Sequence, residues 1–228
     1  MKKFDKLPEY MRTEAVYPYY EILQKKRGSL LFKRIFDVVI ALVLFIILLP
    51  VNVVLALLVG LTSKGGVFFC QKRVTTYGRE FKIIKFRTMV ADAPKLGTQV
   101  TTNNDMRVTK VGRFLRKVRL DELPQLINII KGDMSIVGTR PEVPYYVEQY
   151  TEDMYATLLL PAGVTSKASI EYKDEEKILT SAPDKEVDRT YVEVVLPEKM
   201  KYNLAYIKEY SFLTDIRLMF ETVIAVLH

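Results

Sequence analysis

The longest mostly apolar stretch covers residues 38–61, VVIALVLFIILLPVNVVLALLVGL, and contains no charged residue. The run is long enough for a membrane-spanning helix, which needs about 20 apolar residues. Pro50 interrupts it near the middle, beside the polar Asn52, and predicts a kinked or broken helix because proline removes a backbone hydrogen bond. Each half then holds about a dozen residues, or roughly 18 Å of helix, which enters one leaflet without crossing the membrane.

Two topologies fit this broken apolar run. Basic residues flank both of its ends, and the positive-inside rule therefore favours the same, cytoplasmic side for both. A re-entrant helix that turns at Pro50 satisfies this rule, and a kinked spanning helix is the alternative, since membrane helices tolerate proline. The charge symmetry favours re-entry. The flanking basic residues are Lys25, Lys26, Arg27, Lys33 and Arg34 before the run and Lys64, Lys72 and Arg73 after it.

A short β-hairpin is predicted after the apolar run. Residues 67–69 and 81–86 have strand composition, and turn residues at 75–78 join them. Lys85 and Arg87 lie two positions apart and so project from one face, where two cations can hold a diphosphate. A solvated basic edge strand is the alternative. Residues 96–105 have the composition of a loop.

Residues 107–119 predict a basic amphipathic helix. They include six basic residues and no acidic one, while Val111, Leu115 and Val118 repeat at helical spacing. Such helices lie in the membrane interface, attracted by anionic lipid and by apolar burial. Nucleic-acid binding is the rival interpretation, but the chain has no nucleic-acid module signature. We therefore expect membrane lipid, and no nucleic acid, as a partner.

Two adjacent carboxylates, Asp121 and Glu122, follow this basic segment. Pro124 suits the first turn of the helix that comes next, so the carboxylates lie near a helix N-terminus, where the helix dipole favours negative charge. An aspartate with an ordinary pKa of about 3.9 is ionised at neutral pH and needs no activating base to attack phosphorus. Ordinary acidic residues at a helix start are the alternative.

A tight turn is predicted within residues 132–141, GDMSIVGTRP. Two glycines and a proline surround Arg140, which the turn presents as a guanidinium, the group best suited to bidentate phosphate binding. Neither GxxxxGK[ST] nor GxGxxG occurs in the chain, so phosphate recognition must come from such side chains.

Composition narrows the possible chemistry. The 228 residues suit one domain, and 34 Lys and Arg against 27 Asp and Glu give a formal net charge of +7, which favours an anionic partner. Cysteine occurs once, as Cys70, and histidine once, as His228, which excludes Ser-His-Asp and Cys-His catalysis, His/Cys zinc sites and disulfides. Any metal is then a hard, oxygen-ligated ion such as Mg²⁺.

Several short motifs occur in one order along the chain and together resemble the bacterial sugar transferase family, the monotopic polyprenyl-phosphate hexose-1-phosphate transferases. The resemblance covers roughly residues 30–228, and it is the joint order of the motifs that is specific. The motifs are Lys33-Arg34-x-x-Asp37, the apolar run broken at Pro50, Lys85-Phe86-Arg87-Thr88-Met89, Asp105-x-Arg107-x-Thr109, Leu115-Arg116, Leu120-Asp121-Glu122-Leu123-Pro124-Gln125 and Met134-Ser135-Ile136-Val137-Gly138-Thr139-Arg140-Pro141.

The resemblance implies transfer of a sugar 1-phosphate from a UDP-sugar to a polyprenyl phosphate, with release of UMP, at the start of surface glycan assembly. It implies that Asp121 is the nucleophile, forms a covalent phosphosugar intermediate and helps to hold Mg²⁺, and that Glu122 is a general base assisting the acceptor. It also places the protein in the bacterial inner membrane with the active site on the cytoplasmic face. By position in the matching motifs, the substrate-binding set is Lys85, Arg87, Arg107, Arg113 and Arg140.

The expected fold is α+β and mostly helical. It comprises an N-terminal arm (1–30), a proline-broken re-entrant membrane helix (31–64) and one compact cytosolic domain (65–228) with a short β-hairpin and interfacial amphipathic helices. A catalytically silent membrane-anchored scaffold of the same shape is the alternative function, and the intact carboxylate pair argues against it. The sequence leaves open which sugar is transferred and whether the protein forms a homodimer.

Three positions depart from the family pattern. Leu49 precedes Pro50 where a serine is usual, so the serine's help in satisfying freed backbone carbonyls is missing, and Asn52 is a candidate to replace it. Thr139 replaces a proline in the turn that carries Arg140. Residues 162–166 read AGVTS where the family has Pro-Gly-Ile-Thr-Gly, a region expected to influence donor choice.

Overall fold

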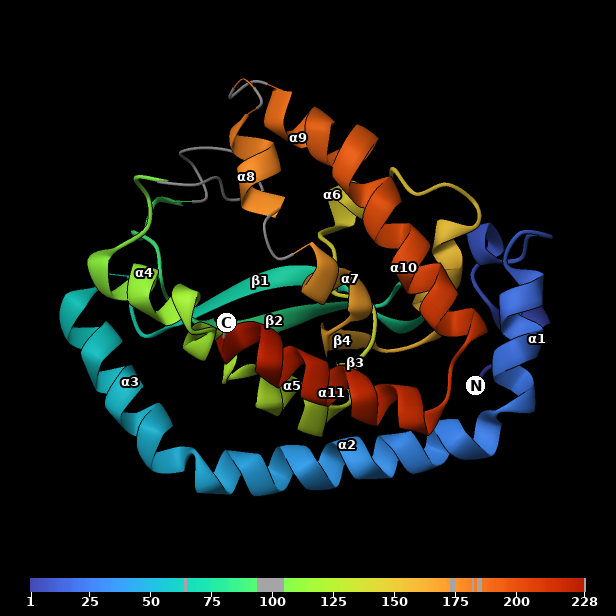
Figure 1. The fold of residues 1–228 in the computed structure, drawn as a ribbon, viewed down its shortest axis with the longest axis horizontal. Helices are drawn as coiled ribbons and strands as arrows, with labels where there is room; N and C mark the ends of the chain where they lie inside the picture. Colours follow the sequence, from blue (N-terminus) through green and yellow to red (C-terminus); the bar gives the residue numbers. More distant parts are fainter. Residues whose placement is uncertain (64, 94–104, 173–174, 182, 184–185, 228) are drawn as a thin grey trace.

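The structure, a computed structural model, is mostly helical and contains two small sheets (Figure 1). It describes residues 1–63, 65–93, 105–172, 175–181, 183 and 186–227. The loop expected at 96–105 therefore lies, up to residue 104, outside the described residues. The predicted α+β class, with helices predominating, is confirmed.

The described helices and strands have the following bounds. The helices are α1 Tyr17–Lys25, α2 Arg27–Ile47, α3 Leu49–Thr62, α4 Lys110–Lys117, α5 Gln125–Lys131, α6 Pro144–Val147, α7 Lys167–Glu171, α8 Glu175–Thr180, α9 Val187–Thr190, α10 Leu196–Lys208 and α11 Phe212–Leu227. The strands are β1 Phe68–Val74, β2 Glu80–Phe86, β3 Met134–Val137 and β4 Ala162–Thr165.

The apolar run forms two helices, α2 and α3, that meet at a bend. Pro50 stands in the first turn of α3, and Leu48 between the helices has φ −87° and ψ 3°. The Asn52 side chain donates a hydrogen bond from Nδ2 to the Leu48 carbonyl at 2.9 Å, and the Asn52 amide donates to the same carbonyl at 2.8 Å. This carbonyl is not the one that Pro50 frees, which is that of Ile46, four residues before the proline. Within the described chain, α2 and α3 reach the length and apolarity of a membrane span only together, bent by 64°, and no helix does so alone.

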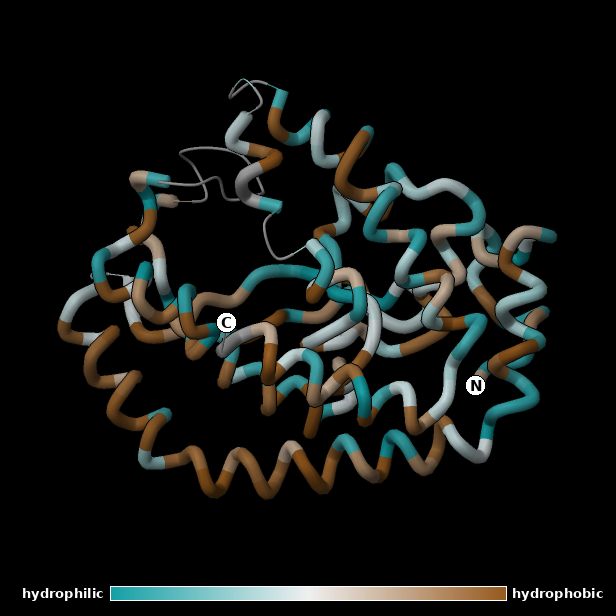
Figure 2. Tube along the Cα trace, viewed as in Figure 1, coloured by the Kyte–Doolittle hydropathy of each residue, from teal (hydrophilic) through white to brown (hydrophobic). Residues whose placement is uncertain are grey.

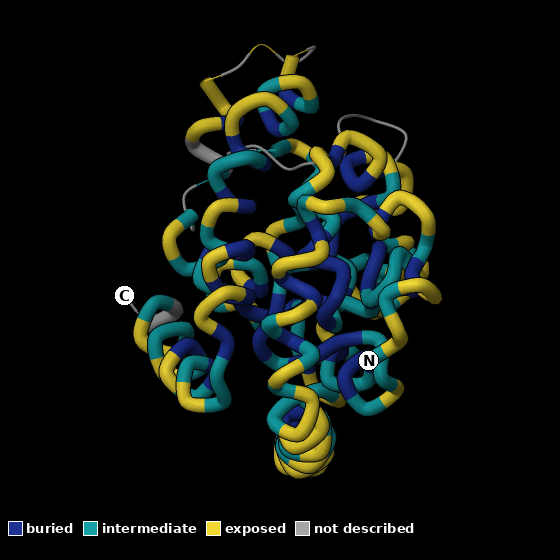
Figure 3. The backbone as a smooth tube through the Cα atoms, turned by 90° about the vertical axis from the view of Figure 1, so that its right-hand side faces the viewer, coloured by how far each residue is buried: buried dark blue, intermediate teal, exposed yellow. Residues whose placement is uncertain are grey.

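The bent pair lies along the base of the molecule with its apolar surface largely uncovered. Hydrophobic residues occupy the second half of α2 and most of α3, with the polar Asn52 near the start of α3 (Figure 2). A view turned by 90° looks along α2, which projects below the other elements and is mostly exposed (Figure 3). Only a narrow inner side packs against the rest of the protein, through residues such as Ala41, Leu55 and Val59. An apolar surface of this extent is unusual on a protein surrounded by water.

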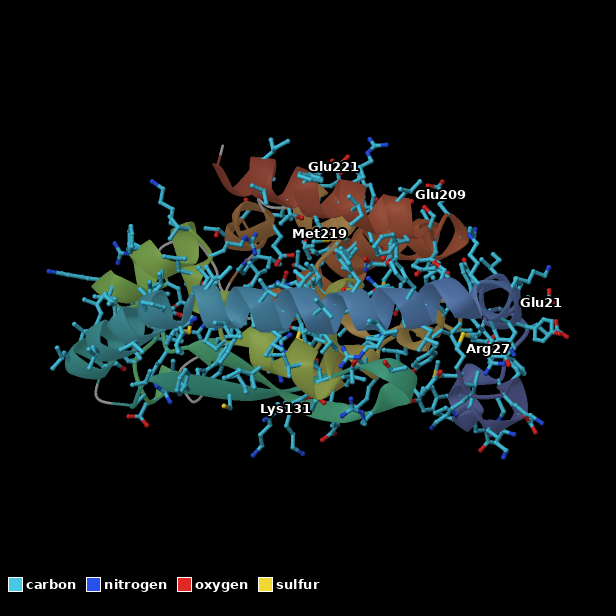
Figure 4. All side chains as sticks on the ribbon, turned by 90° about the horizontal axis from the view of Figure 1, so that it is seen from below. Glu21, Arg27, Lys131, Glu209, Met219 and Glu221 are labelled. Carbon is cyan, nitrogen blue, oxygen red and sulfur yellow. The ribbon has the colours of Figure 1, made fainter. Side chains whose placement is uncertain are left out.

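Polar contacts of α2 fasten it to three other elements. The Lys33 ammonium, 5% exposed, lies 2.9 Å from an Asp215 carboxylate oxygen of α11. Asp37 accepts a hydrogen bond from the Ser135 hydroxyl of β3 at 2.6 Å, and the Arg34 guanidinium donates to the Ile130 carbonyl of α5. Seen from below, α2 accordingly runs between α11, where Met219 and Glu221 are labelled, and α5, which ends at Lys131 (Figure 4).

The predicted hairpin is confirmed. Strands β1 and β2 pair antiparallel from Phe68 opposite Phe86 to Val74 opposite Glu80. Helix α5 packs on β2, and Asn128 joins them because its side chain accepts from the Ile84 amide at 3.0 Å and donates to the Lys82 carbonyl at 2.8 Å. The hairpin and α5 thereby hold the segment before α5, residues 120–124, at one end of β2.

A second, parallel sheet of β3 and β4 was not among the sequence predictions. Ser135 lies opposite Gly163, and the chain continues from β3 directly into the turn that carries Arg140. Gly138 and Gly163 allow the two backbones to approach closely, since a Cβ atom added to Gly163 would lie 2.2 Å from the Gly138 nitrogen. This close pairing determines where the Arg140 turn sits relative to β4.

The main hydrophobic core includes the N-terminal segment. Met11, Val16 and Leu23 are fully buried together with residues from β3, α10 and the segments between them. The residues expected to form an N-terminal arm, 1–30, are thus packed on the same core as the remainder of the chain, and α2 begins within that range, at Arg27.

Candidate active site

The carboxylate pair lies on a single turn of 3-10 helix, Leu120–Glu122, between α4 and α5. The predicted basic helix 107–119 is shorter than expected: α4 covers Lys110–Lys117, with the Thr109 hydroxyl accepting from the Gly112 amide as its N-cap. Arg119 then adopts a left-handed conformation, φ 55°, which reverses the chain into the 3-10 turn. Pro124 directly precedes the first residue of α5.

Asp121 is buried without a direct partner. Its residue surface is 7% exposed, and within the described part of the chain its carboxylate makes no hydrogen bond or ion pair. Burial raises the pKa of Asp121, although the positive charges of Lys85, Arg116 and Arg140 oppose the rise. A carboxylate held in this state has lone pairs available for a phosphorus atom or a metal ion.

Glu122 joins two cations from distant parts of the chain. The Lys85 ammonium lies 2.8 Å from Glu122 Oε1, and Arg140 contacts both carboxylate oxygens through Nη1 and Nη2. Burial alone would raise the pKa of Glu122, but the attraction of Arg140 and Lys85 outweighs it and holds that pKa well below the usual range. In this arrangement Glu122 is a weak proton acceptor and a strong holder of two cations.

The two cations are themselves fixed by their surroundings. Burial lowers the pKa of Lys85, against the attraction of Glu122, and the Glu122 carboxylate raises the pKa of Arg140. Arg140 also donates to the Val164 carbonyl of β4 at 3.4 Å, and Arg73 donates to the Pro141 carbonyl at 3.0 Å. These contacts hold the Arg140 turn beside the carboxylate pair.

The other three predicted phosphate-binding residues are not brought to the pair. Arg87 donates to the Gly66 and Phe68 carbonyls, at 3.1 and 2.9 Å, so it does not converge with Lys85 on one partner as expected. Arg107 forms a two-point ion pair with Asp105, with its shortest contact at 2.6 Å. Arg113 is exposed on α4. The structure therefore brings Lys85 and Arg140 to the Asp121–Glu122 pair, called the dyad below, whereas Arg87, Arg107 and Arg113 make their contacts elsewhere.

Two residues near the dyad received no role in the sequence analysis. The charge of Arg116, near the end of α4, favours the ionised form of Asp121. Gln125, the first residue of α5, is 1% exposed and pairs with nothing through its amide among the described residues. The signals were a basic residue five positions before Asp121 and an amide at the first position of α5, directly after Pro124.

Magnesium fits the site only together with substrate oxygens. Within the described residues no group of three or more Asp, Glu, His or Cys side chains is placed to hold a metal. Asp121 has an unengaged carboxylate, whereas Glu122 is occupied by two cations. Mg²⁺ commonly binds one or two carboxylates, substrate phosphates and water, which matches one free carboxylate beside a phosphate site.

A lysine and an arginine can bind phosphate groups, and a neighbouring buried carboxylate can attack phosphorus or hold a metal ion. The model of the family described as bacterial sugar transferase matches residues 28–228. The chain therefore belongs to the bacterial sugar transferase family, and the resemblance stated from its motifs is confirmed.

Curated relatives carry related names. A UDP-glucose:undecaprenyl-phosphate glucose-1-phosphate transferase of Escherichia coli is 37% identical over 94% of this chain and 44% of its own length. A UDP-N-acetylgalactosamine-undecaprenyl-phosphate N-acetylgalactosaminephosphotransferase of Aeromonas hydrophila is 34% identical over 90% of this chain and 47% of its own. The exopolysaccharide production protein ExoY of Sinorhizobium fredii is 32% identical over 85% of this chain and 84% of its own length. This chain thus spans less than half of the first two relatives.

Proposed function

We propose that this protein transfers a sugar 1-phosphate from a UDP-sugar to a polyprenyl phosphate and releases UMP. The observation that carries the proposal is the buried Asp121 carboxylate, without a partner among the described residues, beside the Lys85–Glu122–Arg140 cluster. The names of the relatives support the two substrate classes, a UDP-sugar and a polyprenyl phosphate.

The first step is attack by an Asp121 carboxylate oxygen on the sugar-bearing phosphorus of the donor. The new bond joins that oxygen to phosphorus, and the bond between phosphorus and the bridging oxygen breaks, so that UMP leaves with the electron pair. In the second step a phosphate oxygen of the acceptor attacks the same phosphorus, and the carboxylate is the leaving group. Lys85 and Arg140 neutralise charge on the phosphates in both steps, the dominant contribution in phosphoryl transfer.

Glu122 acts first by positioning these two cations. When the donor phosphates draw Lys85 and Arg140 toward themselves, the Glu122 carboxylate loses the attraction that depresses its pKa. It then becomes a better proton acceptor, as the general-base role assigned from the family requires, for an acceptor phosphate that arrives singly protonated.

Magnesium, when bound, would be held by Asp121 and phosphate oxygens and would supply Lewis-acid stabilisation of the diphosphate. We expect EDTA to abolish UMP release and added Mg²⁺ to restore it. Full activity in excess EDTA would contradict a metal requirement.

The bent pair α2 and α3 would anchor this site at a bacterial inner membrane. Its uncovered apolar surface suits lipid, and a polyprenyl phosphate presents its reactive group at the headgroup layer. We propose a re-entrant pair that keeps both ends, and the dyad, on the cytoplasmic side.

The test of the function is a covalent intermediate. Full-length protein in detergent or nanodiscs, given a UDP-sugar without acceptor, should gain the mass of a sugar phosphate and release UMP. Asp121→Asn keeps the size of the side chain but removes the attacking charge, so it should do neither. Turnover retained by Asp121→Asn would exclude this mechanism, and a wild-type protein inert toward a panel of UDP-sugars would favour a silent scaffold.

A further inference from the structure

A cavity of about 200 Å³ lies beside the carboxylate pair and has no part in the steps above. It is enclosed by the turn that carries Glu122, by α5, β4 and α7, and by the C-terminal part of α11. Figure 1 shows α11, in red, crossing in front of α5 and the β3–β4 sheet, with α7 above it. Small-molecule sites usually measure about 300–1,000 Å³, so this cavity holds part of a substrate rather than a whole one.

The dyad reaches this cavity through Glu122. The Glu122 carboxylate already binds Lys85 and Arg140, so it has little capacity left for the hydroxyl or amide groups of a ligand. Gln125 belongs to the same wall, but both polar atoms of its amide are buried inside the protein, away from the cavity surface. Neither residue therefore favours a polar ligand.

The hydroxyl groups that line the cavity already have partners. The Ser169 hydroxyl lies 2.9 Å from that of Ser166. The Thr165 and Thr222 hydroxyls lie 2.7 Å apart, and Thr222 also donates to the Leu218 carbonyl at 2.7 Å. None of these hydroxyls needs a ligand to satisfy its hydrogen bonding.

The remaining wall of the cavity is aliphatic. The side chains that form it are Leu123, Leu126, Val164, Ile170 and Ala225. Covering such side chains with hydrocarbon removes apolar surface from water on both partners. The interior of the cavity therefore favours an apolar group.

The cation at the rim of this cavity is Arg119. It is exposed, and within the described part of the chain its guanidinium forms no hydrogen bond or ion pair. The Glu122 amide donates to the Arg119 carbonyl at 3.3 Å, so Arg119 belongs to the same turn as the dyad. Helix α4, which is rich in basic residues and exposes Phe114, ends at Lys117, two residues earlier. The rim thus presents a positive charge beside a helix of the kind that lies at membrane interfaces.

The parts of the proposed substrates differ in how they match this cavity. A hexose or a uracil ring would bring several donors and acceptors to a lining whose polar groups already have partners or are buried. A polyprenyl phosphate has a hydrocarbon chain for the aliphatic wall and a phosphate for Arg119. That phosphate also has to reach Glu122, the residue assigned as the base for the acceptor.

We propose that this cavity binds the phosphate-bearing end of the polyprenyl chain, with the first isoprene units against the aliphatic wall and Arg119 contacting the phosphate. The proposal rests on the proposed function, because it specifies how the acceptor of that reaction is held. Lys85 and Arg140 then remain for the donor diphosphate. Arg119 is a binding residue for the acceptor alone.

Binding measurements can separate the contribution of the chain from that of the phosphate. Full-length protein in detergent would be titrated with undecaprenyl phosphate, with undecaprenol, which lacks the phosphate, and with phosphatidylglycerol, an ordinary anionic lipid. Native mass spectrometry would measure the bound fraction of each. Wild type should bind undecaprenyl phosphate most tightly and phosphatidylglycerol most weakly.

The chain is tested by filling the cavity. Ala225→Leu takes up space in the aliphatic wall, so it should weaken undecaprenyl phosphate and undecaprenol about tenfold each and leave phosphatidylglycerol unchanged. The matched control is Ala205→Leu, the same substitution at an exposed position of α10 outside the cavity, which should bind all three as wild type does. Val164→Thr places a hydroxyl in the wall, should act in the same direction, and serves if thermal unfolding shows that Ala225→Leu does not fold.

The phosphate is tested at the rim. Arg119→Gln removes the charge, so it should weaken undecaprenyl phosphate about fivefold and leave undecaprenol unchanged. Lys131→Gln, which removes a charge at an exposed position of α5 outside the cavity, is the control and should change neither.

The two half-reactions of the transfer give a second readout. With a UDP-sugar that the wild type accepts, Ala225→Leu and Arg119→Gln should form the covalent intermediate at the wild-type rate. They should discharge it to undecaprenyl phosphate about five- to tenfold more slowly when the acceptor is below saturation.

The proposal is overturned if the folded cavity variants bind undecaprenyl phosphate as wild type does, if they lose phosphatidylglycerol equally, or if they slow formation of the intermediate as much as its discharge. Equal loss of phosphatidylglycerol would assign the cavity to a membrane lipid, and slower formation would assign it to the donor. Failure of the proposed function is distinguishable, because a wild type that forms no intermediate contradicts that function while the binding comparison still decides what occupies the cavity.

Discussion

At the scale of single residues, the candidate site depends on the Glu122 carboxylate, which binds two cations at once. Glu122 neutralises Lys85 and Arg140, whereas the neighbouring Asp121 has no direct partner among the residues that the structure describes. Two adjacent residues with the same charge therefore have opposite pKa shifts, raised for Asp121 by burial and lowered for Glu122 by the two cations. Such a division of roles between neighbouring acids is typical of catalytic pairs.

Arg140 should matter far more than Arg113, although both belong to the predicted substrate-binding set. Arg140→Gln removes the guanidinium that reaches Glu122, and we expect kcat/KM for the UDP-sugar to fall roughly 100-fold or more. Arg113→Gln is the matched control on an exposed face of α4, and its kcat/KM should stay within about threefold of wild type. Equal losses in both variants would show that Arg113 reaches the substrate.

Asp121→Asn should stabilise the folded protein at neutral pH while it removes activity. Because burial raises the pKa of Asp121, the ionised carboxylate costs stability at pH values above its folded pKa, and that cost disappears below the unfolded value. The melting temperature of the variant should exceed that of wild type at pH 7, by about 2–4 °C for each kcal/mol, and the difference should shrink on acidification. A variant that is less stable than wild type at pH 7 would contradict this.

At the scale of elements, the bent pair α2 and α3 is the feature on which the proposed membrane attachment depends. Its bend combines a proline in the first turn of α3 with an asparagine that caps the Leu48 carbonyl. In the proposed re-entrant arrangement, both outer ends, Arg27 and Thr62, lie on the same side of the membrane. A straight helix would separate them.

Cysteine labelling can test this topology. Cysteines would be placed at Gly28, where an added Cβ meets nothing within 4 Å, and at the exposed Thr62, in a Cys70→Ser background. Both should be shielded from a membrane-impermeant thiol reagent in cells with only the outer membrane opened, and both should react once the inner membrane is opened. Labelling of the Gly28 site alone in the first condition would indicate a spanning helix. Pro50→Leu should shift the population toward that result, because it restores the missing backbone hydrogen bond.

At the scale of the whole molecule, the apolar pair is rigidly joined to the core. Lys33 and Asp37 of α2 meet Asp215 of α11 and Ser135 of β3 in a buried polar cluster. Tyr206 of α10 adds a hydrogen bond to Asp215 at 2.6 Å. Contacts between segments about 100 to 180 residues apart therefore fix α2 relative to the candidate site, and with it the depth that we propose for this site at a membrane.

Lys33→Met should destabilise the entire fold, since it leaves two buried carboxylates without their cation. Removing one partner of a buried ion pair costs about 3–5 kcal/mol, so the melting temperature should fall by roughly 6–20 °C. Lys25→Met, on the exposed side of α1, is the control and should change it little. If Lys33→Met melts like wild type, the cluster does not hold α2 in place.

Sequence reasoning located the elements whose signals are local. The hairpin was predicted because both strands and their turn lie within 20 residues, and the break at Pro50 because proline acts on its own helix. The parallel pair β3 and β4 was missed, since each strand has four residues and its partner comes from a separate part of the chain. The pairing of Lys85 with Glu122 was missed for the same reason.

By itself, the sequence determined the apolar run and its break, the adjacent Asp121 and Glu122, the arginine in its turn and the family to which these motifs belong. Periodicity and turn chemistry act over a few residues, so they can be read along the chain. The tertiary structure alone decided that Lys85 and Arg140 reach Glu122 while Arg87, Arg107 and Arg113 do not, and that the Gln125 amide is buried without a hydrogen-bond partner among the described residues. Both depend on which distant segments pack together and exclude water, because burial and proximity determine which charges and hydrogen bonds are satisfied.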